Sequence, residues 1–139
     1  MLATMENTQA VSLKQMPLVK TGGYIGGIWH QANATFRVTD PATGDEITEV
    51  SAMDAIAATD AVRIAQDAFG PWAALLPQDR ALVLKKWHAK IIENREELAW
   101  IMVAEQGKPI SEARGEIDYA ASFVEFYAEE AKRTNVEGI

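Results

Sequence analysis

The sequence predicts a mostly helical chain that begins with two small β-hairpins. Up to residue 50, short segments of alternating polar and apolar residues flank glycine-containing turns, and from Ser51 onward the apolar residues recur with a period of 3.6. Gly70-Pro71 and Gly107 with Pro109 interrupt this helical pattern, and Asn94 can cap a further helix between them, which divides the pattern into four helices. The 139 residues, 48% hydrophobic and 24% charged, have the length and composition of one globular domain.

Charge and composition exclude several classes of protein. Thirteen lysines and arginines against twenty acids leave a net charge of −7, which opposes binding to nucleic acid. The chain has no cysteine, so it can hold no disulfide, thiolate zinc site or cysteine nucleophile. Its apolar runs are far shorter than the roughly 20 residues that cross a bilayer, and its start resembles neither a secretory signal nor a transit peptide. We therefore expect a cytoplasmic protein without nucleic-acid or membrane partners.

The start of the chain is expected to be a mobile tail followed by a hairpin. Residues 1–20 form the tail, because the stretch as far as Gln15 is polar and lacks periodicity. Gly26-Gly27 can adopt the positive φ angles of a two-residue primed turn. The expected strands of this hairpin are Tyr24-Ile25 and Ile28-Trp29.

A second hairpin is expected immediately afterwards. Thr35–Val38 and Ile47–Val50 alternate in polarity, and Asp40–Gly44 supplies the residues of a turn between them. Both hairpins together are too small to be stable without further packing.

The first helix is expected to begin at a capping box, Ser51-x-x-Asp54, and to end at Gly70-Pro71. One apolar stripe runs along it at spacings of four, three and four: Ala58, Val62, Ala65 and Phe69. This stripe is the predicted buried face.

Two shorter helices are expected next. Pro77 opens the second helix at its first position, where the missing N–H has no cost, and Asn94 with Glu97 can form a capping box for the third. Gly107 ends the third helix, and Pro109 follows that stop. The predicted inward residues are Leu84, Trp87 and Ile91 on the second helix, and Leu98, Ile101 and Met102 on the third.

The last helix is expected from Ile110 to Arg133, with acids in its early turns and Lys132-Arg133 at its end, as the helix dipole favours. It has two apolar faces. One comprises Ile110, Ala113, Ile117, Ala120, Val124 and Ala131, and the other is aromatic, with Tyr119, Phe123 and Phe126. Because the rest of the chain can cover only one of these faces, the sequence predicts that a packing partner is missing.

No group of residues forms a catalytic constellation. His30 and His88 lack partners at metal-ligand or triad spacing, and the glycine pairs fit no dinucleotide-binding or phosphate-binding loop. We interpret the glutamates as solvated helix faces: Glu96, Glu97, Glu125, Glu129 and Glu130. Trp72, Trp87 and Trp100 are either core residues, the interpretation we favour, or anchors at an interface. Composition and spacing alone leave the function open.

Four sequence motifs stand in order between Tyr24 and the C-terminus. They are Tyr24-Ile25-Gly26-Gly27-x-Trp29, Asp40-Pro41-Ala42-Thr43-Gly44, Ala104-Glu105-Gln106-Gly107-Lys108-Pro109, and Ala120-Ala121-Ser122-Phe123 followed by Ala128-Glu129-Glu130-Ala131-Lys132-Arg133. Together they closely resemble the aldehyde dehydrogenase superfamily, and within it most resemble NAD(P)-dependent succinate-semialdehyde dehydrogenases. Asp40 departs from the pattern, since the family usually has Asn there.

The resemblance implies that the chain is the N-terminal part of an α/β dehydrogenase fold. Residues 21–139 would form an incomplete portion of the coenzyme-binding domain, and the family's nucleotide-binding helix, catalytic cysteine, general base and oxyanion-holding asparagine all lie beyond the position that matches Ile139. NAD or NADP would belong to the full-length protein, and we expect none to bind this chain alone. The remainder of the dehydrogenase subunit is the implied partner, in a homo-oligomer.

The resemblance also implies two minor sites. In some relatives a monovalent cation is held by backbone carbonyls at the positions of Val38 and Thr39 and by an acid at the position of Glu105; alternatively, Glu105 only ends a helix. The family's substrate tunnel is lined by the last helix, so Tyr119 and Phe123 are candidate tunnel residues, with plain core packing as the alternative.

Two hypotheses therefore remain. In the first, the chain is a fragment of an oxidoreductase that converts succinate semialdehyde to succinate, inactive alone. In the second, it is a short interaction module that docks on full-length dehydrogenase subunits or associates with itself. The exposed apolar face of the last helix is the only sequence feature that favours the module.

Overall fold

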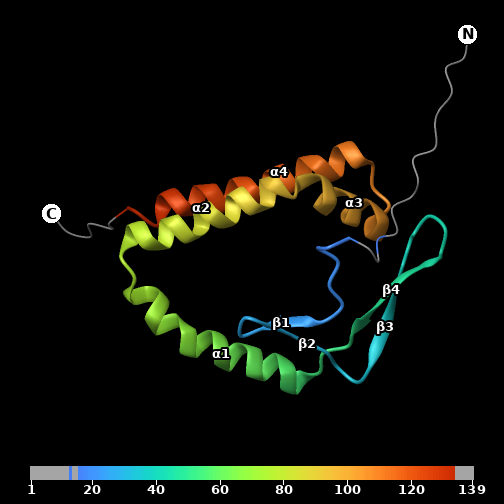
Figure 1. Ribbon diagram of the computed structural model, residues 1–139, viewed down its shortest axis with the longest axis horizontal. Coiled ribbons are helices and arrows are strands. Elements are labelled where there is room, and N and C mark those ends of the chain that lie inside the picture. The colour runs from blue at the N-terminus through green and yellow to red at the C-terminus, as the bar shows by residue number, and fades with distance from the viewer. Residues whose placement is uncertain (1–12, 14–15, 134–139) are drawn as a thin grey trace, which may run out of the picture.

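The computed structural model describes residues 13 and 16–133, and it contains the predicted two hairpins followed by four helices (Figure 1). The predicted tail residues 1–12, 14 and 15 lie outside the described residues. The strands are β1 (Gly23–Ile25), β2 (Ile28–His30), β3 (Thr35–Thr39) and β4 (Glu46–Ser51). The helices are α1 (Ala55–Ala74), α2 (Pro77–Glu93), α3 (Arg95–Gln106) and α4 (Ile110–Glu130).

Both hairpins have the predicted turns. Gly26 and Gly27 have φ angles of 60° and 87°, and this turn pairs Tyr24 with Trp29 across β1 and β2. Their rings lie 5.0 Å apart between centroids. In the β3–β4 turn, the Asp40 side chain accepts the Ala42 N–H at 2.7 Å, as expected where an Asx residue opens a turn.

Helix α1 begins and ends differently from the prediction. Its N-cap is Asp54, whose carboxylate accepts the Ala57 N–H at 2.8 Å. Ser51 does not cap it, because Ser51 ends β4 and its hydroxyl donates to Gln31 at 2.8 Å. Gly70-Pro71 does not end it either. Glycine lacks the Cβ that proline normally pushes out of the helical region, so the helix loses one hydrogen bond and continues to Ala74.

The predicted buried stripe of α1 is also wrong. Its four residues are exposed, with Val62 and Phe69 at 70% and 62%. The half-buried residues lie one position earlier, at Ala57, Ala61 and Ile64, on the side that meets the β1–β2 turn. Helix α1 packs extensively on no other described helix or strand, and none of its residues is buried.

The other three helices pack together. Helix α4 lies against α2 and α3 (Figure 1), and small residues at the contacts, Ala81, Ala99, Ala113, Ala121 and Ala128, let the backbones approach closely. Ile117 is the only larger side chain among the buried apolar residues that the structure describes. Partly buried neighbours pack around this cluster: Ile91, Leu98, Met102, Val103 and Ile110.

The joints between the helices confirm three predictions and correct two. Pro77 is the first residue of α2, Gly107 ends α3 with a φ of 71°, and α4 begins at Ile110. Asn94 does not cap α3 with its side chain, because its amide donates instead to the Lys90 carbonyl of α2 at 2.8 Å. Helix α4 ends at Glu130, three residues before the predicted Arg133.

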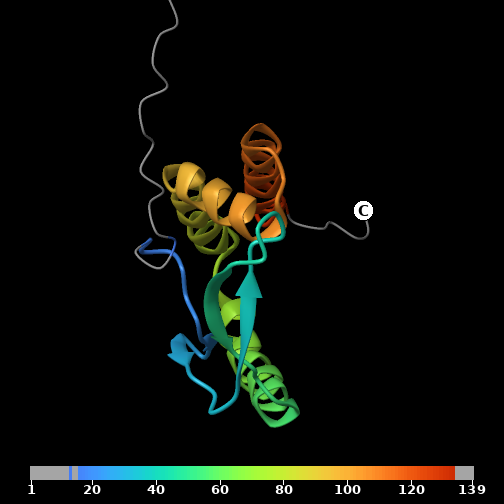
Figure 2. The same cartoon turned by 90° about the vertical axis from the view of Figure 1, so that its right-hand side faces the viewer.

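The elements enclose a ring, which is open when viewed as in Figure 1 and narrow when turned by 90° (Figure 2). The segment before β1 closes it. The Leu18 N–H donates to the Glu97 carboxylate of α3 at 2.7 Å, and the Thr21 carbonyl accepts the Ser51 N–H of β4 at 2.7 Å. At the opposite corner, the Arg80 guanidinium donates to the Ala73 and Leu75 carbonyls at the end of α1. No helix in the described part of the chain is long and apolar enough to cross a membrane.

Candidate functional site

The described residues contain no ready catalytic or metal centre. No three of their histidine, aspartate and glutamate side chains gather in a group that could hold a metal ion. His30 lines a pocket of about 550 Å³ between the β1–β2 hairpin and the first turns of α1, and His88 is half-buried on α2. The pocket also contains Asp54, but that carboxylate is occupied as the cap of α1.

The predicted cation-site residues come from two segments that meet. Val38 and Thr39 lie at an irregularity in the pairing of β3 with β4, and Glu105 is exposed in the last turn of α3. These segments touch where Gly107 faces Pro41, because a Cβ added to that glycine would lie 2.9 Å from the proline ring. The structure thus brings the two segments to one corner, and the cation site itself stays a prediction.

The predicted tunnel residues lie together on α4. The rings of Tyr119 and Phe123 meet edge to face with centroids 4.8 Å apart, and those of Phe126 and Tyr127 are 5.3 Å apart. All four side chains are exposed, Tyr119 at 65% and Phe123 at 46%. We call Tyr119, Phe123, Phe126 and Tyr127 the aromatic face. No part of the described chain covers Tyr119 and Phe123, and their assignment to a substrate tunnel or to core packing stays a prediction.

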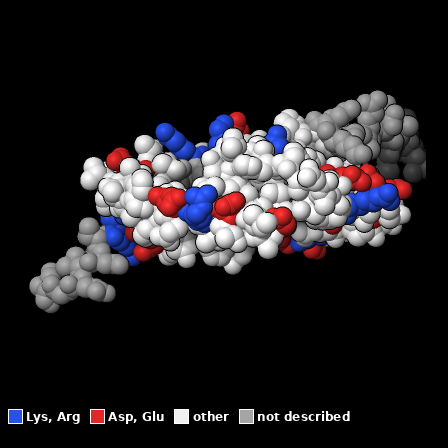
Figure 3. All heavy atoms as spheres, turned by 90° about the horizontal axis from the view of Figure 1, so that it is seen from below, with Lys and Arg blue, Asp and Glu red and all other residues white. Residues whose placement is uncertain are grey.

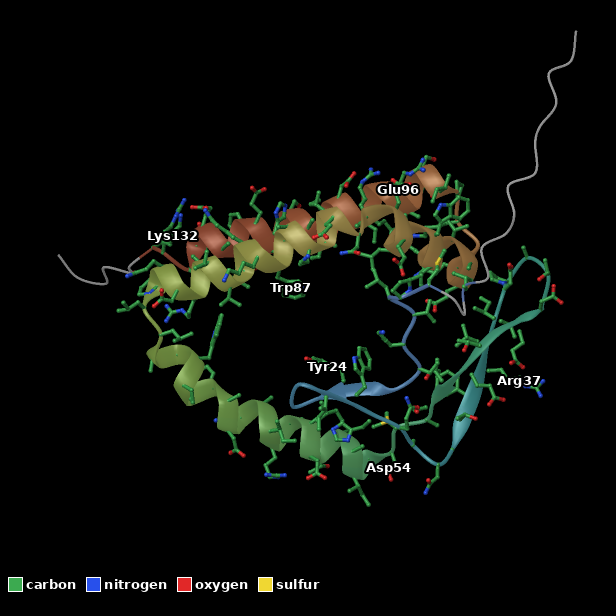
Figure 4. The ribbon with its side chains drawn as sticks, in the orientation of Figure 1. Tyr24, Arg37, Asp54, Trp87, Glu96 and Lys132 are labelled. Carbon is green, nitrogen blue, oxygen red and sulfur yellow. The ribbon has the colours of Figure 1, made fainter. Side chains whose placement is uncertain are left out.

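The tryptophans are exposed as well, which corrects the favoured core interpretation. Trp72, Trp87 and Trp100 expose 38%, 58% and 46% of their surface. Figure 4 shows Trp87 of α2 and Tyr24 of β1 pointing from opposite sides into the space that the ring encloses. Val83 precedes Trp87 by one helical turn, so it lies on the same side of α2.

We call Tyr24, Trp72, Val83 and Trp87 the inner face. Trp72 continues the stripe of α1 that includes Ala61 and Ile64, at spacings of four along the helix from Ile64. Sequence analysis missed this face because it assigned Trp87 to a core and placed the α1 stripe one residue too late. Val83 and Trp87 are four residues apart, so they form a second apolar stripe on α2 beside the one that runs from Leu84 to Ile91. This second stripe was the sequence signal that could have revealed the inner face.

Charged side chains occupy other parts of the surface, and Figure 3, which views the molecule from below, shows a largely uncharged face between a few charged groups. The largest network joins α3 to α4. Arg95 donates twice to Asp118 at 2.6 Å, and Arg114 donates to Glu96 at 2.7 and 3.0 Å. These bonds raise the pKa of Arg95 and lower the pKa of both Asp118 and Glu96.

A second ion group ties α2 to the end of α4. Glu129 accepts hydrogen bonds from Lys132 and from Lys85, the latter at 2.7 Å, and together they lower its pKa from 4.5 to about 2. The same contact raises the pKa of Lys85. In both networks the hydrogen bonds favour the ionised carboxylate, and the pairs link α3 to α4 and α2 to α4.

Comparison with known proteins shows which protein family this chain belongs to. Residues 29–139 match the model of the aldehyde dehydrogenase family, and this chain belongs to that family. It is 46% identical over 125 residues to 3-sulfolactaldehyde dehydrogenase of Pseudomonas putida, covering 88% of this chain and 26% of that protein. It is 44% identical over 125 residues to glutarate-semialdehyde dehydrogenase of Pseudomonas putida, with the same two coverages.

A solved structure extends the comparison. The succinate-semialdehyde dehydrogenase of Burkholderia pseudomallei superposes with a TM-score of 0.82 at 45% identity, covering 86% of this chain and 25% of that one. The chain therefore spans about a quarter of the length of the relatives it matches. Its hairpins and helices correspond to a part of a larger dehydrogenase subunit.

Proposed function

We propose that this chain serves as the N-terminal portion of the coenzyme-binding domain of an NAD(P)-dependent aldehyde dehydrogenase. Residues 21–139 form that portion, and the preceding segment is tied to it where the Leu18 N–H donates to Glu97. The supporting observation is the missing core. No large side chain is fully buried in the described residues, and all four tryptophans are exposed, although relatives contain the same frame within a chain four times as long.

The substrate we propose is succinate semialdehyde, oxidised to succinate. The three relatives named above act on succinate semialdehyde, glutarate semialdehyde and 3-sulfolactaldehyde. Each of these compounds carries an aldehyde at one end and an acid group elsewhere. An aldehyde with an anionic tail is therefore the substrate class, and succinate semialdehyde is the member that the sequence motifs favour.

The chain's own residues do not fit a dinucleotide. Gly26 and Gly27 form a strand-to-strand turn with no helix after it, whereas a pyrophosphate needs a glycine-rich turn from a strand into a helix. The start of α1 carries the Asp54 carboxylate, which repels phosphate. The cofactor would therefore bind to the rest of the subunit, as would the reacting aldehyde, and the chain alone would be inactive.

Smaller roles complete the proposal. The Val38 and Thr39 carbonyls with the Glu105 carboxylate would hold a monovalent cation, since hard oxygen ligands suit such an ion. Tyr119 and Phe123 would line the substrate tunnel. The assembled protein would be a cytoplasmic homo-oligomer.

A single-chain chimera tests this function. Residues 29–139 replace the aligned segment of the Burkholderia pseudomallei enzyme, and NAD(P) reduction is followed with succinate semialdehyde. We expect kcat/KM within about tenfold of the parent enzyme, because only the supporting frame is exchanged. A deletion of the same segment is the control and should be inactive. A folded chimera without activity would contradict the proposal.

The second candidate function is an interaction module that docks on intact dehydrogenase subunits or on itself. The exposed aromatic face of α4 is the observation that favours it. Binding of this chain to the undeleted Burkholderia pseudomallei enzyme would support the module. Under the first proposal, an intact subunit already contains its own segment equivalent to this chain. No binding of this chain to the intact enzyme is then expected.

A further inference from the structure

The side chains of the inner face are exposed, although hydrogen bonds hold the elements that surround them in a closed ring. Tyr24, Val83 and Trp87 expose 62%, 48% and 58% of their surface, and Tyr24 and Trp87 point into the enclosed space (Figure 4). Large apolar residues grouped in this way mark a surface that binds another protein part. An aromatic pair already backs this face, because Tyr24 rests on Trp29.

The frame that presents the inner face is held by contacts that do not involve it. Leu18 to Glu97 and Thr21 to Ser51 fix one side of the ring, and Arg80 fixes the corner between α1 and α2. The α2–α4 packing is secured separately by Lys85 and Glu129. The β1 and α2 parts of the surface are thus held in place, so their binding requires little additional ordering.

We infer that the inner face is a docking surface that recognises the other three quarters of an aldehyde dehydrogenase subunit even when that part is a separate chain. This inference rests on the proposed function. The occupant follows from the comparison, since the Burkholderia pseudomallei enzyme keeps the same frame at a TM-score of 0.82 within a chain of which this frame is one quarter. No peptide bond between the two parts is needed, because exposed apolar area and a fixed frame supply the recognition.

Co-expression tests the inference. The full chain is produced with the Burkholderia pseudomallei enzyme from which the aligned segment has been deleted and to which an affinity tag has been added. We expect the two to purify together in a 1:1 ratio and to reduce NAD(P) with succinate semialdehyde, which the deleted enzyme cannot do alone.

Two matched variants locate the contact on α2. Trp87→Glu places a charge in the inner face and should lower the recovered complex at least tenfold. Leu82→Glu makes the same kind of change at a residue that is 52% exposed but lies on about the opposite side of the helix, five residues earlier, and should leave the recovery unchanged. Circular dichroism of each variant alone checks that its helices are intact.

The results separate this inference from the function it rests on. An active single-chain chimera with no complex between the separate chains overturns the inference and leaves the function standing. Equal recovery of Trp87→Glu and the unchanged chain also overturns it, as does a stable dimer of this chain formed through the inner face. A folded but inactive chimera removes the function and the inference together.

Discussion

At the scale of single residues, Glu129 links the acid stability of the fold to one carboxylate. Its pKa is lowered from 4.5 to about 2 by Lys132 and Lys85. A lowered folded-state pKa contributes stability that is present above pH 4.5 and is lost as the pH falls towards 2. We predict that carbon-13 NMR will show the Glu129 carboxyl titrating near pH 2, and that urea unfolding will show stability declining through this range.

A lysine pair provides the control for that prediction. Lys85→Met removes one hydrogen-bond donor and should move the Glu129 pKa back towards 4.5. Lys86→Met removes a charge from the same helix but leaves both partners of Glu129 in place. It should change the pKa of Glu129 far less. Equal shifts in the two variants would mean that general charge, not the contact, sets the pKa.

Gly107 and Gly44 offer a matched test of a packed glycine. Both have positive φ angles, 71° and 78°, but a Cβ on Gly107 would lie 2.9 Å from Pro41, whereas one on Gly44 would meet nothing within 4 Å. Gly44→Ala should cost about 1–2 kcal/mol from the left-handed backbone alone. We predict that urea unfolding will show a larger loss for Gly107→Ala, and similar losses would show that Pro41 moves aside freely.

Local chemistry decided which residue predictions succeeded. The turn at Gly26-Gly27 and the stop at Gly107 follow from backbone angles that glycine alone adopts easily, so sequence was sufficient. Ser51 and Asn94 were assigned to caps by their spacing, but each found another partner, Gln31 and the Lys90 carbonyl. Side chains with several possible partners depend on tertiary structure that spacing does not contain.

At the scale of elements, α1 is the least supported helix. It has no buried residue and packs extensively on no other described element. Because helical stability in proteins comes mostly from packing, its amides should exchange with deuterium faster than those of α2 and α4. We predict this order for hydrogen exchange measured by mass spectrometry. Protection of α1 equal to that of α4 would mean that something covers α1 in solution.

The aromatic face of α4 leads to a prediction of self-association. Burial of one aromatic side chain contributes roughly 1.5–3 kcal/mol, so Tyr119, Phe123 and Phe126 gain several kcal/mol when two copies pair through this helix. We predict a dimer at tens of micromolar by sedimentation, and a monomer for Phe123→Glu.

The control for that dimer is a similar change elsewhere. Ile56→Glu introduces the same charge at a residue of α1 that is 72% exposed, and it should leave the dimer intact. A wild-type monomer with cooperative melting at these concentrations would show that the aromatic face is covered by other means.

The order of the helices and strands could be predicted from the sequence, but the buried face of each helix was harder to predict. Periodicity identifies a helix wherever apolar residues recur every 3.6 positions, and all four helices were found in this way. The stripe on α1 was misplaced because that helix has apolar residues over a wide arc and no helix partner to select one side. On α4, where α2 and α3 both press against it, Ala113 and Ile117 were correctly predicted to be buried.

At the scale of the whole molecule, we predict that the chain alone will not reduce NAD or NADP in the presence of succinate semialdehyde. It has no cysteine to attack the aldehyde, and its described turns offer no pyrophosphate site. A spectrophotometric assay measures turnover, and titration calorimetry measures cofactor binding. Turnover that persists through repurification, or low-micromolar binding of either cofactor, would contradict this prediction.

The family could be predicted from the ordered motifs, whereas the inner face required the structure. Motifs such as Glu105-Gln106-Gly107-Lys108-Pro109 are fixed by local turn and helix-end geometry, so they remain recognisable in a partial chain. The inner face joins Tyr24 to Trp87 across the ring, and no local pattern relates residues that far apart.

The hydrogen bond between Leu18 and Glu97 also sets an order of events during synthesis. Its two residues are 79 positions apart, so a ribosome adding roughly 5–20 residues per second needs about 4–16 seconds to make the second after the first. The hairpins and α1 emerge during that interval while the ring is still open. The ring can close only after Glu97 has emerged, so vectorial translation makes both hairpins and α1 before the contact that closes the ring.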